Sequence, residues 1–110
     1  MSNLIIYSAT FIKKAKIYKK KHNSIVDELR ELEINLLKNP QQGNDLGAGL
    51  YKIRLAVKSK GKGKSGGYRI ITYLISNQEE GYRINMLTIY DKSEESSIDK
   101  KVLLQIIKSL

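Results

Sequence analysis

The chain has 110 residues, with 20 lysines and arginines, 11 acidic residues, one histidine and no cysteine, so its net charge is +9. The lack of cysteine excludes disulfides, thiolate nucleophiles and cysteine-ligated metal sites, and a single histidine excludes a mechanism that needs two imidazoles. This length predicts one domain over residues 1–110, and the charge indicates a polyanionic partner, with nucleic acid first. We see neither a membrane-spanning apolar run nor a signal sequence, so we expect a cytoplasmic protein without membrane contact.

The first forty residues predict a strand followed by two helices. Residues 4–7 form a short apolar run typical of a strand, and Ser8 or Thr10 can cap the helix that follows. Apolar side chains then recur at helical spacing, first over residues 11–18 and again over residues 25–37. The single proline ends the second stretch, so we expect two antiparallel helices joined by a short turn.

The rest of the chain predicts three strands and a last helix. Residues 41–49 are rich in glycine and are expected to be a connection. Over residues 51–57 apolar side chains alternate mainly with cationic ones, which predicts a strand with one apolar and one cationic face. Residues 68–75 and 82–90 are rich in β-formers and should pair as a hairpin, and residues 98–110 carry an apolar helical stripe that a preceding serine can cap.

The element order β-α-α-β-β-β-α predicts an α+β fold. We expect a small, twisted, mainly antiparallel sheet, with two N-terminal helices and a C-terminal helix packed on one of its faces. No internal repeat or domain boundary interrupts this order.

Most of the net charge lies in residues 50–74, which hold seven basic residues and no acid. Within this window residues 58–67 form a glycine- and lysine-rich loop, which is expected to be mobile and to grip the RNA backbone. The lysines expected to bind RNA are Lys58, Lys60, Lys62 and Lys64. The loop is not a nucleotide-binding P-loop, because position 58 is not glycine and a strand follows. A second basic group comprises Lys13, Lys14, Lys16, Lys19, Lys20 and Lys21, which we interpret mainly as a solvated helix face.

The cationic strand face is the strongest chemical signal. Lys52 and Arg54 are two residues apart and share a face, Arg69 opens the expected partner strand, and Lys92 follows the last strand. Clustered cations stabilise charge that develops on phosphoryl oxygens, and their mutual repulsion lowers the pKa of a lysine among them, which could then act as a base. RNA supplies its own nucleophile, the 2′-hydroxyl, so cleavage needs no metal or cofactor, although the same face could simply bind RNA.

Three segments resemble the RelE/HigB superfamily of bacterial toxins: YKIR at residues 51–54, GGYRIITY at residues 66–73 and LTIYDKSE at residues 87–94. The likeness is closest to a HigB-like subgroup with the KGKSGG loop found here at residues 62–67. The resemblance implies the toxin of a type II toxin–antitoxin system, a ribosome-dependent endoribonuclease that cuts mRNA in the ribosomal A site without a cofactor. The implied partners are mRNA, the ribosome and a cognate antitoxin with a helix-turn-helix DNA-binding motif, through which alone the toxin would reach operator DNA.

The resemblance also implies site residues. Lys52, Arg54, Arg69 and Lys92 match cations that contact the phosphate, transfer protons or support the transition state in the family. Ser93 stands where the family has a further arginine, and its base-stacking C-terminal tyrosine has no clear equivalent here. Tyr90 is the substitute candidate, with packing in the core as its alternative, so the general base is not assigned. Two other functions stay open: an RNA- or ribosome-binding module without catalysis, and a decayed toxin that acts only as an antitoxin partner.

Overall fold

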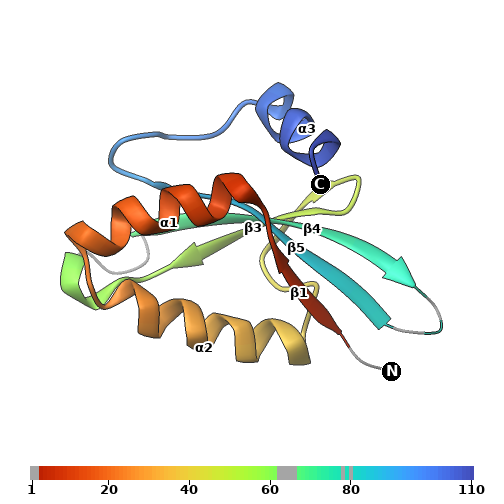
Figure 1. Ribbon diagram of the computed structural model, residues 1–110, viewed down its shortest axis with the longest axis horizontal. Helices are drawn as coiled ribbons and strands as arrows, with labels where there is room; N and C mark the ends of the chain where they lie inside the picture. Colours follow the sequence, from red (N-terminus) through yellow and green to blue (C-terminus); the bar gives the residue numbers. More distant parts are fainter. Residues whose placement is uncertain (1–2, 62–66, 78, 80) are drawn as a thin grey trace.

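The computed structural model describes residues 3–61, 67–77, 79 and 81–110 (Figure 1). In chain order its elements are β1 (Leu4–Tyr7), α1 (Ala9–Lys21), α2 (Ile25–Lys38), β2 (Asn44–Gly47), β3 (Leu50–Leu55), the short 3₁₀ helix η1 (Lys58–Lys60), β4 (Tyr68–Asn77), β5 (Gly81–Asp91) and α3 (Lys100–Lys108). No helix in this described part of the chain has the length and apolarity that a bilayer crossing demands.

The strands form one five-stranded sheet in the order β1-β5-β4-β3-β2. All neighbouring pairs are antiparallel except β1 and β5, which are parallel. The long β4–β5 hairpin lies at the centre of the sheet, and β1 and β2 lie at its edges. The predicted α+β class and mainly antiparallel sheet are therefore confirmed.

The helix pair α1–α2 forms where the sequence predicts it, and it covers one face of the sheet (Figure 1). The Ser8 hydroxyl oxygen caps α1 by accepting a hydrogen bond from the Phe11 N–H at 3.0 Å, and α2 ends where the Asn39 N–H bonds to the carbonyl of Asn35. Beneath the two helices lies the larger core, whose buried residues are Phe11, Tyr18, Ile25, Leu32, Leu36, Ile53, Leu55, Val57, Tyr68, Ile70, Ile84, Met86 and Ile89.

The C-terminal helix α3 packs on the other face, so the expectation that all helices share one face is wrong. Its Leu103 and Ile106 join a second, smaller core with Ile71 and Tyr90 of the sheet. Successive strand residues point to opposite faces, so the buried neighbours Ile70 and Ile71 belong to different cores. A strand that is buried on both faces carries apolar residues at successive positions, as β4 does at Ile70 and Ile71. Figure 1 shows α3 apart from the α1–α2 hairpin.

Two local predictions are also corrected. Residues 41–49, expected to be only a connection, include β2, which pairs with the first half of β3. Strand pairing uses backbone groups that every residue carries, so β2 forms without β-forming side chains. Gly43 brings the chain onto β3 with φ +99°, and a Cβ there would lie 2.6 Å from the carbonyl oxygen of Lys52. At α3 the cap is Asp99 rather than a serine, because its carboxylate accepts from the Lys101 N–H at 2.9 Å.

Candidate active site

The strand register brings three of the predicted site residues into one row across the sheet. Arg54 of β3 lies directly opposite Arg69 of β4, and Arg69 lies opposite Tyr90 of β5. Lys52 precedes Arg54 by two residues and therefore points to the same face, where it is paired with Ile71 in the next row. Ile71 and Tyr90 belong to the α3-side core, so this is the face that α3 partly covers. We call Lys52, Arg54, Arg69 and Tyr90 together the site face.

The four side chains differ in their access to solvent. Arg54 is exposed and Lys52 is half-buried, whereas Arg69 is only 5% exposed and Tyr90 only 1%. Arg69 Nη1 donates a hydrogen bond to the carbonyl oxygen of Tyr68 at 3.3 Å, which fixes part of its guanidinium within the sheet. Tyr90 is therefore a packed core residue, and it is not placed as an exposed platform on which a base could stack.

The Tyr90 phenol is nevertheless electrostatically part of the site. Burial raises its pKa, the charge of Arg69 lowers it and the charge of Glu95 raises it, with a net rise above the ordinary value of 10.0. A phenol with a raised pKa keeps its proton at neutral pH. Tyr90 can therefore donate a hydrogen bond or a proton beside Arg69, but it cannot serve as a base there.

A small hollow opens beside the row, between the site face and the start of α3. Its volume is about 250 Å³, and it is lined by Leu46, Leu50, Lys52, Ile71, Tyr90, Ser97, Ile98, Lys100 and Leu103. Sites for drug-sized molecules run from roughly 300 to 1,000 Å³. The hollow is thus suited to a single small group, and it places the side chains of Lys52 and Tyr90 against the same space.

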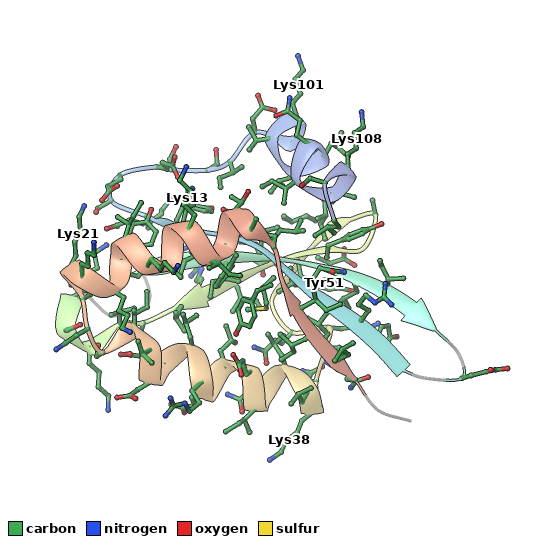
Figure 2. All side chains as sticks on the ribbon, in the orientation of Figure 1. Lys13, Lys21, Lys38, Tyr51, Lys101 and Lys108 are labelled. Carbon is green, nitrogen blue, oxygen red and sulfur yellow. The ribbon has the colours of Figure 1, made fainter. Side chains whose placement is uncertain are left out.

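No carboxylate of the described strands points to the site face, and the acids near it come from outside the sheet: Glu28 and Glu31 of α2 line a hollow shared with Lys52 and Arg54, and the charge of Glu95 acts on Tyr90. The described strand residues that share this face are Leu4, Ile6, Asn44, Leu46, Leu50, Lys52, Arg54, Arg69, Ile71, Tyr73, Ile75, Arg83, Asn85, Leu87, Thr88 and Tyr90. The nearest strand acid in sequence, Asp91, lies one residue past Tyr90 and so points to the opposite face. Of the lysines of α3, Lys101 and Lys108 extend away from the sheet (Figure 2), whereas Lys100 lines the hollow beside the row. Positive charges held together in this way favour a bound anion.

Lys92 lies apart from the row. Its backbone N–H donates to the carbonyl of Gly67 at 3.1 Å, which continues the pairing beyond β5. Its ammonium donates to the carbonyl of Ser96 at 3.3 Å, within the segment that leads to α3. The structure thus ties Lys92 to the β5–α3 connection, and its role in cleavage stays a prediction.

Lys60, one of the four loop lysines expected to bind RNA, has a buried partner instead. Lys60 is paired with Asp91 and its ammonium lies 4.9 Å from the centre of the Tyr68 ring. The side chains of Lys60 and Asp91 are only 7% and 6% exposed, on the α1–α2 side of the sheet. Lys60 is therefore a structural residue in this fold, and we withdraw it from the expected RNA contacts.

The other loop lysines have different positions. Lys58 has an exposed side chain, while its backbone N–H donates to Glu28 Oε1 at 2.7 Å. The predicted contacts of Lys62 and Lys64, and most of the KGKSGG motif, lie outside the described residues.

The sequence did not predict the buried ion pair between Lys60 and Asp91. Burial alone would raise the pKa of Asp91, but hydrogen bonds from Lys60 and Ser93 outweigh it and hold that pKa below its ordinary value of 3.8. The one signal in the sequence is an aspartate directly after five residues, MLTIY at positions 86–90, that carry no charged side chain. A carboxylate so close to a core needs a buried partner, but its spacing does not say which of the lysines supplies it.

A comparison with protein families gives an independent result. Residues 6–109 match the family described as the RelE toxin of the RelE / RelB toxin-antitoxin system. This range contains every helix and strand of the fold in full, except that it omits the first two residues of β1. The match is to the family as a whole, so the closer likeness to a HigB-like subgroup stays a prediction. The chain therefore belongs to the RelE toxin family: it is the toxin of a toxin–antitoxin system, and a cognate antitoxin is its partner.

Proposed function

We propose that this toxin is a metal-independent endoribonuclease that cuts mRNA in the ribosomal A site and so stops translation. The observation that carries the proposal is the row of Arg54, Arg69 and Tyr90 with Lys52 beside it, on a face where the described strands hold no acid. Family membership supports the same activity, because RelE toxins are generally endoribonucleases.

The chemistry follows from what RNA brings to this face. The 2′-hydroxyl oxygen attacks the adjacent phosphorus, and the bond to the 5′-oxygen of the next nucleotide breaks. The products are a 2′,3′-cyclic phosphate and a 5′-hydroxyl end. Negative charge grows on the non-bridging oxygens during this step, and Arg54 and Arg69 are placed to stabilise it.

The reaction needs one residue to accept the proton of the 2′-hydroxyl and another to donate a proton to the leaving 5′-oxygen. Arginine keeps its proton throughout the physiological range, and the raised pKa of Tyr90 keeps the phenol protonated. Of the four residues of the site face, Lys52 is therefore the candidate to accept the proton of the 2′-hydroxyl. Tyr90 or a protonated lysine then supplies the proton that the leaving oxygen takes up.

RNA contacts beyond the reacting phosphate involve the exposed loop. We assign Lys58, Lys62 and Lys64 to the message backbone, and Lys92 to a supporting position near the end of β5. A small basic protein can neutralise the backbone but cannot also distort the message strand, so we expect the ribosome to present the strand and free RNA to be cut poorly. The cognate antitoxin would carry a helix-turn-helix motif and would bring the toxin to operator DNA.

Translation in vitro tests the proposal directly. A ribosome complex stalled on a defined message is incubated with the toxin, and primer extension maps new 5′ ends relative to the A site. We expect cuts within the A-site codon for the native chain, and at least a roughly tenfold slower rate for Arg54→Ala and Lys52→Met. Both residues reach solvent, so these variants should fold, whereas Arg69→Ala removes a buried side chain and needs a folding control.

Each alternative function predicts a different outcome. Ribosomes that stall without new 5′ ends would indicate a binding module and would refute cleavage. Harmless expression of the native chain, with antitoxin binding intact, would indicate a decayed toxin. Cleavage that survives unchanged in both variants would show that the site face is not the catalytic surface.

A further inference from the structure

Strand β5 carries one extra residue beside the site face. Thr88 of β5 is paired with Ile71 of β4, but the next residue of β4, Thr72, is paired with Met86. Leu87 therefore has no partner among the described residues of β4, and it forms a β-bulge. A bulge bends its strand and re-aims the side chains that follow it, and bulges are frequent next to active sites.

The bulge reverses the alternation of side chains along β5. Before it, Ile84 and Met86 point into the core beneath α1 and α2. After it, Tyr90 points to the α3 side and Ile89 points into the α1–α2 core. Strict alternation without the extra residue would put Tyr90 on the same side as Met86, and it would turn Asp91 to the site face.

The site face depends on this reversal in two ways. The bulge brings the Tyr90 phenol opposite Arg69, whereas an unbroken ladder would set Ile89 there. It also turns the Asp91 carboxylate to the other side of the sheet, away from a face whose positive charge it would offset. The arrangement that the proposed reaction uses therefore exists only while the bulge stays at Leu87.

Ser8 lies where the bulge meets strand β1. The pairing of β1 with β5 ends at Tyr7, and the Ser8 N–H continues it by donating to the carbonyl of Met86 at 3.1 Å. The Ser8 hydroxyl then donates to the carbonyl oxygen of Leu87 at 2.5 Å. Ser8 is only 4% exposed and Leu87 is fully buried, so water cannot readily replace this hydrogen bond if the hydroxyl is lost.

Capping of α1 does not explain the whole Ser8 side chain. As the cap, the hydroxyl oxygen accepts a hydrogen bond from the Phe11 N–H at 3.0 Å. A cap needs only an acceptor, which asparagine and aspartate supply as well as serine does, and glycine caps only slightly less well. The hydroxyl hydrogen is thus not needed for the cap, and it is used to hold the bulge.

We propose that Ser8 is a positioning residue, which holds the bulge at Leu87 and thereby keeps Tyr90 beside Arg69 on the site face. Its importance for cleavage rests on the proposed function, whereas its effect on the strand register does not. Because Ser8 is buried, it acts through β5 and not by touching the message.

Three variants separate the bulge from the cap. Ser8→Gly keeps most of the capping but removes the donor to the Leu87 carbonyl. Ser8→Thr keeps the hydroxyl and should preserve both hydrogen bonds. Ile17→Gly is the control, because Ile17 is 50% exposed on α1 and outside both cores, so this change weakens the helix without altering β5. Thermal melts show that each variant is folded.

Nuclear Overhauser contacts across the sheet report the register without any assay of RNA. The native chain, Ser8→Thr and Ile17→Gly should all show Tyr90 opposite Arg69, with the Tyr90 ring in the α3-side core. In Ser8→Gly we expect contacts between Arg69 and Ile89 to appear and the contacts of the Tyr90 ring with that core to weaken. A native register in Ser8→Gly would overturn the proposal.

Cleavage on stalled ribosomes tests whether this positioning matters to the reaction. We expect Ser8→Gly to lower kcat by at least about fivefold with little change in KM, and Ser8→Thr and Ile17→Gly to stay within about twofold of native. Since Ser8 acts through the strand that carries Tyr90, the loss in Ser8→Gly combined with Tyr90→Phe should stay well below the product of the two single losses. Losses that multiply would show that Ser8 acts elsewhere and would overturn the proposal.

The two measurements separate this proposal from the proposed function. If the native chain cuts no message, the ribonuclease proposal fails, and the register of Ser8→Gly still decides whether Ser8 holds the bulge. If Ser8→Gly keeps the native register yet cuts slowly, this proposal is wrong while the site face keeps its proposed role.

Discussion

Replacing Arg54 by glutamine should make the toxin more stable and less active at the same time. Arg54 and Arg69 are directly opposed on β3 and β4, and like charges in such a pair destabilise a sheet. Opposed Cβ atoms lie about 5 Å apart, so we take the two guanidinium groups to be about 7 Å apart. At an effective dielectric constant of about 40, between those of a protein surface and of water, Coulomb's law gives about 1 kcal/mol of repulsion.

Removing this repulsion should raise the melting temperature by about 3–6 °C for a domain of this size. The same change removes a charge from the site face, so we expect cleavage in stalled ribosomes to slow by about tenfold or more. Arg54→Lys keeps the charge and should leave stability within about 0.5 kcal/mol of native. Added salt should shrink the stability gain, because Arg54 is exposed and its interactions are screened.

Arg83→Gln is the matched control. Arg83 is exposed on the same face of β5, but its strand neighbours are Leu4 and Ile75, which carry no charge. We expect little change in its melting temperature or in cleavage. Equal stabilisation by the Arg83 and Arg54 variants would mean that net charge, and not the opposed pair, destabilises the fold. A less stable Arg54→Gln would refute the reasoning outright.

Three further predictions concern buried groups. Lys60→Met should lower the free energy of unfolding, measured by urea titration, by about 3–5 kcal/mol, because it leaves the Asp91 carboxylate buried without its partner. Adding Asp91→Leu to this variant should recover part of the loss. The pKa of Asp91 is held below 3.8, so the ionised carboxylate stabilises the fold fully above that pH, and this contribution is lost as the pH falls below it. The difference in free energy of unfolding between the native chain and Asp91→Asn should therefore shrink in acid. A difference that stays constant with pH would contradict the ion pair. Tyr90→Phe keeps the ring in the α3-side core, so it should change stability by less than about 1.5 kcal/mol while slowing cleavage, and an unaltered cleavage rate would remove the phenol from the reaction.

Much of the fold can be predicted from local patterns. Ser8 caps α1 as expected, the β4–β5 hairpin forms where two β-rich runs flank a turn, and α2 ends before the single proline. The strand period of two also predicts that Lys52 and Arg54 share a face, because side-chain direction in a strand depends only on position. These features depend on contacts within a few residues, which a sequence displays directly.

Other features depend on pairings that no local pattern specifies. The row of Arg54, Arg69 and Tyr90 follows from the registers between β3, β4 and β5. A one-residue slip in either register would send every side chain of a strand to the other face, so the row exists only in the assembled sheet. β2 forms because the edge of β3 offers backbone hydrogen bonds, whatever side chains the added strand carries.

The sequence by itself determined the basic window, the order of the helices and of every strand except β2, and the cationic side of β3, since these are properties of neighbouring residues. Only the tertiary structure decided that α3 partly covers the site face and that Lys60 pairs with Asp91 on the opposite side of the sheet. The physical reason is the cost of burying a charge: an aspartate at the edge of a core must be paired, and which lysine pairs with it depends on where the folded chain brings the two together.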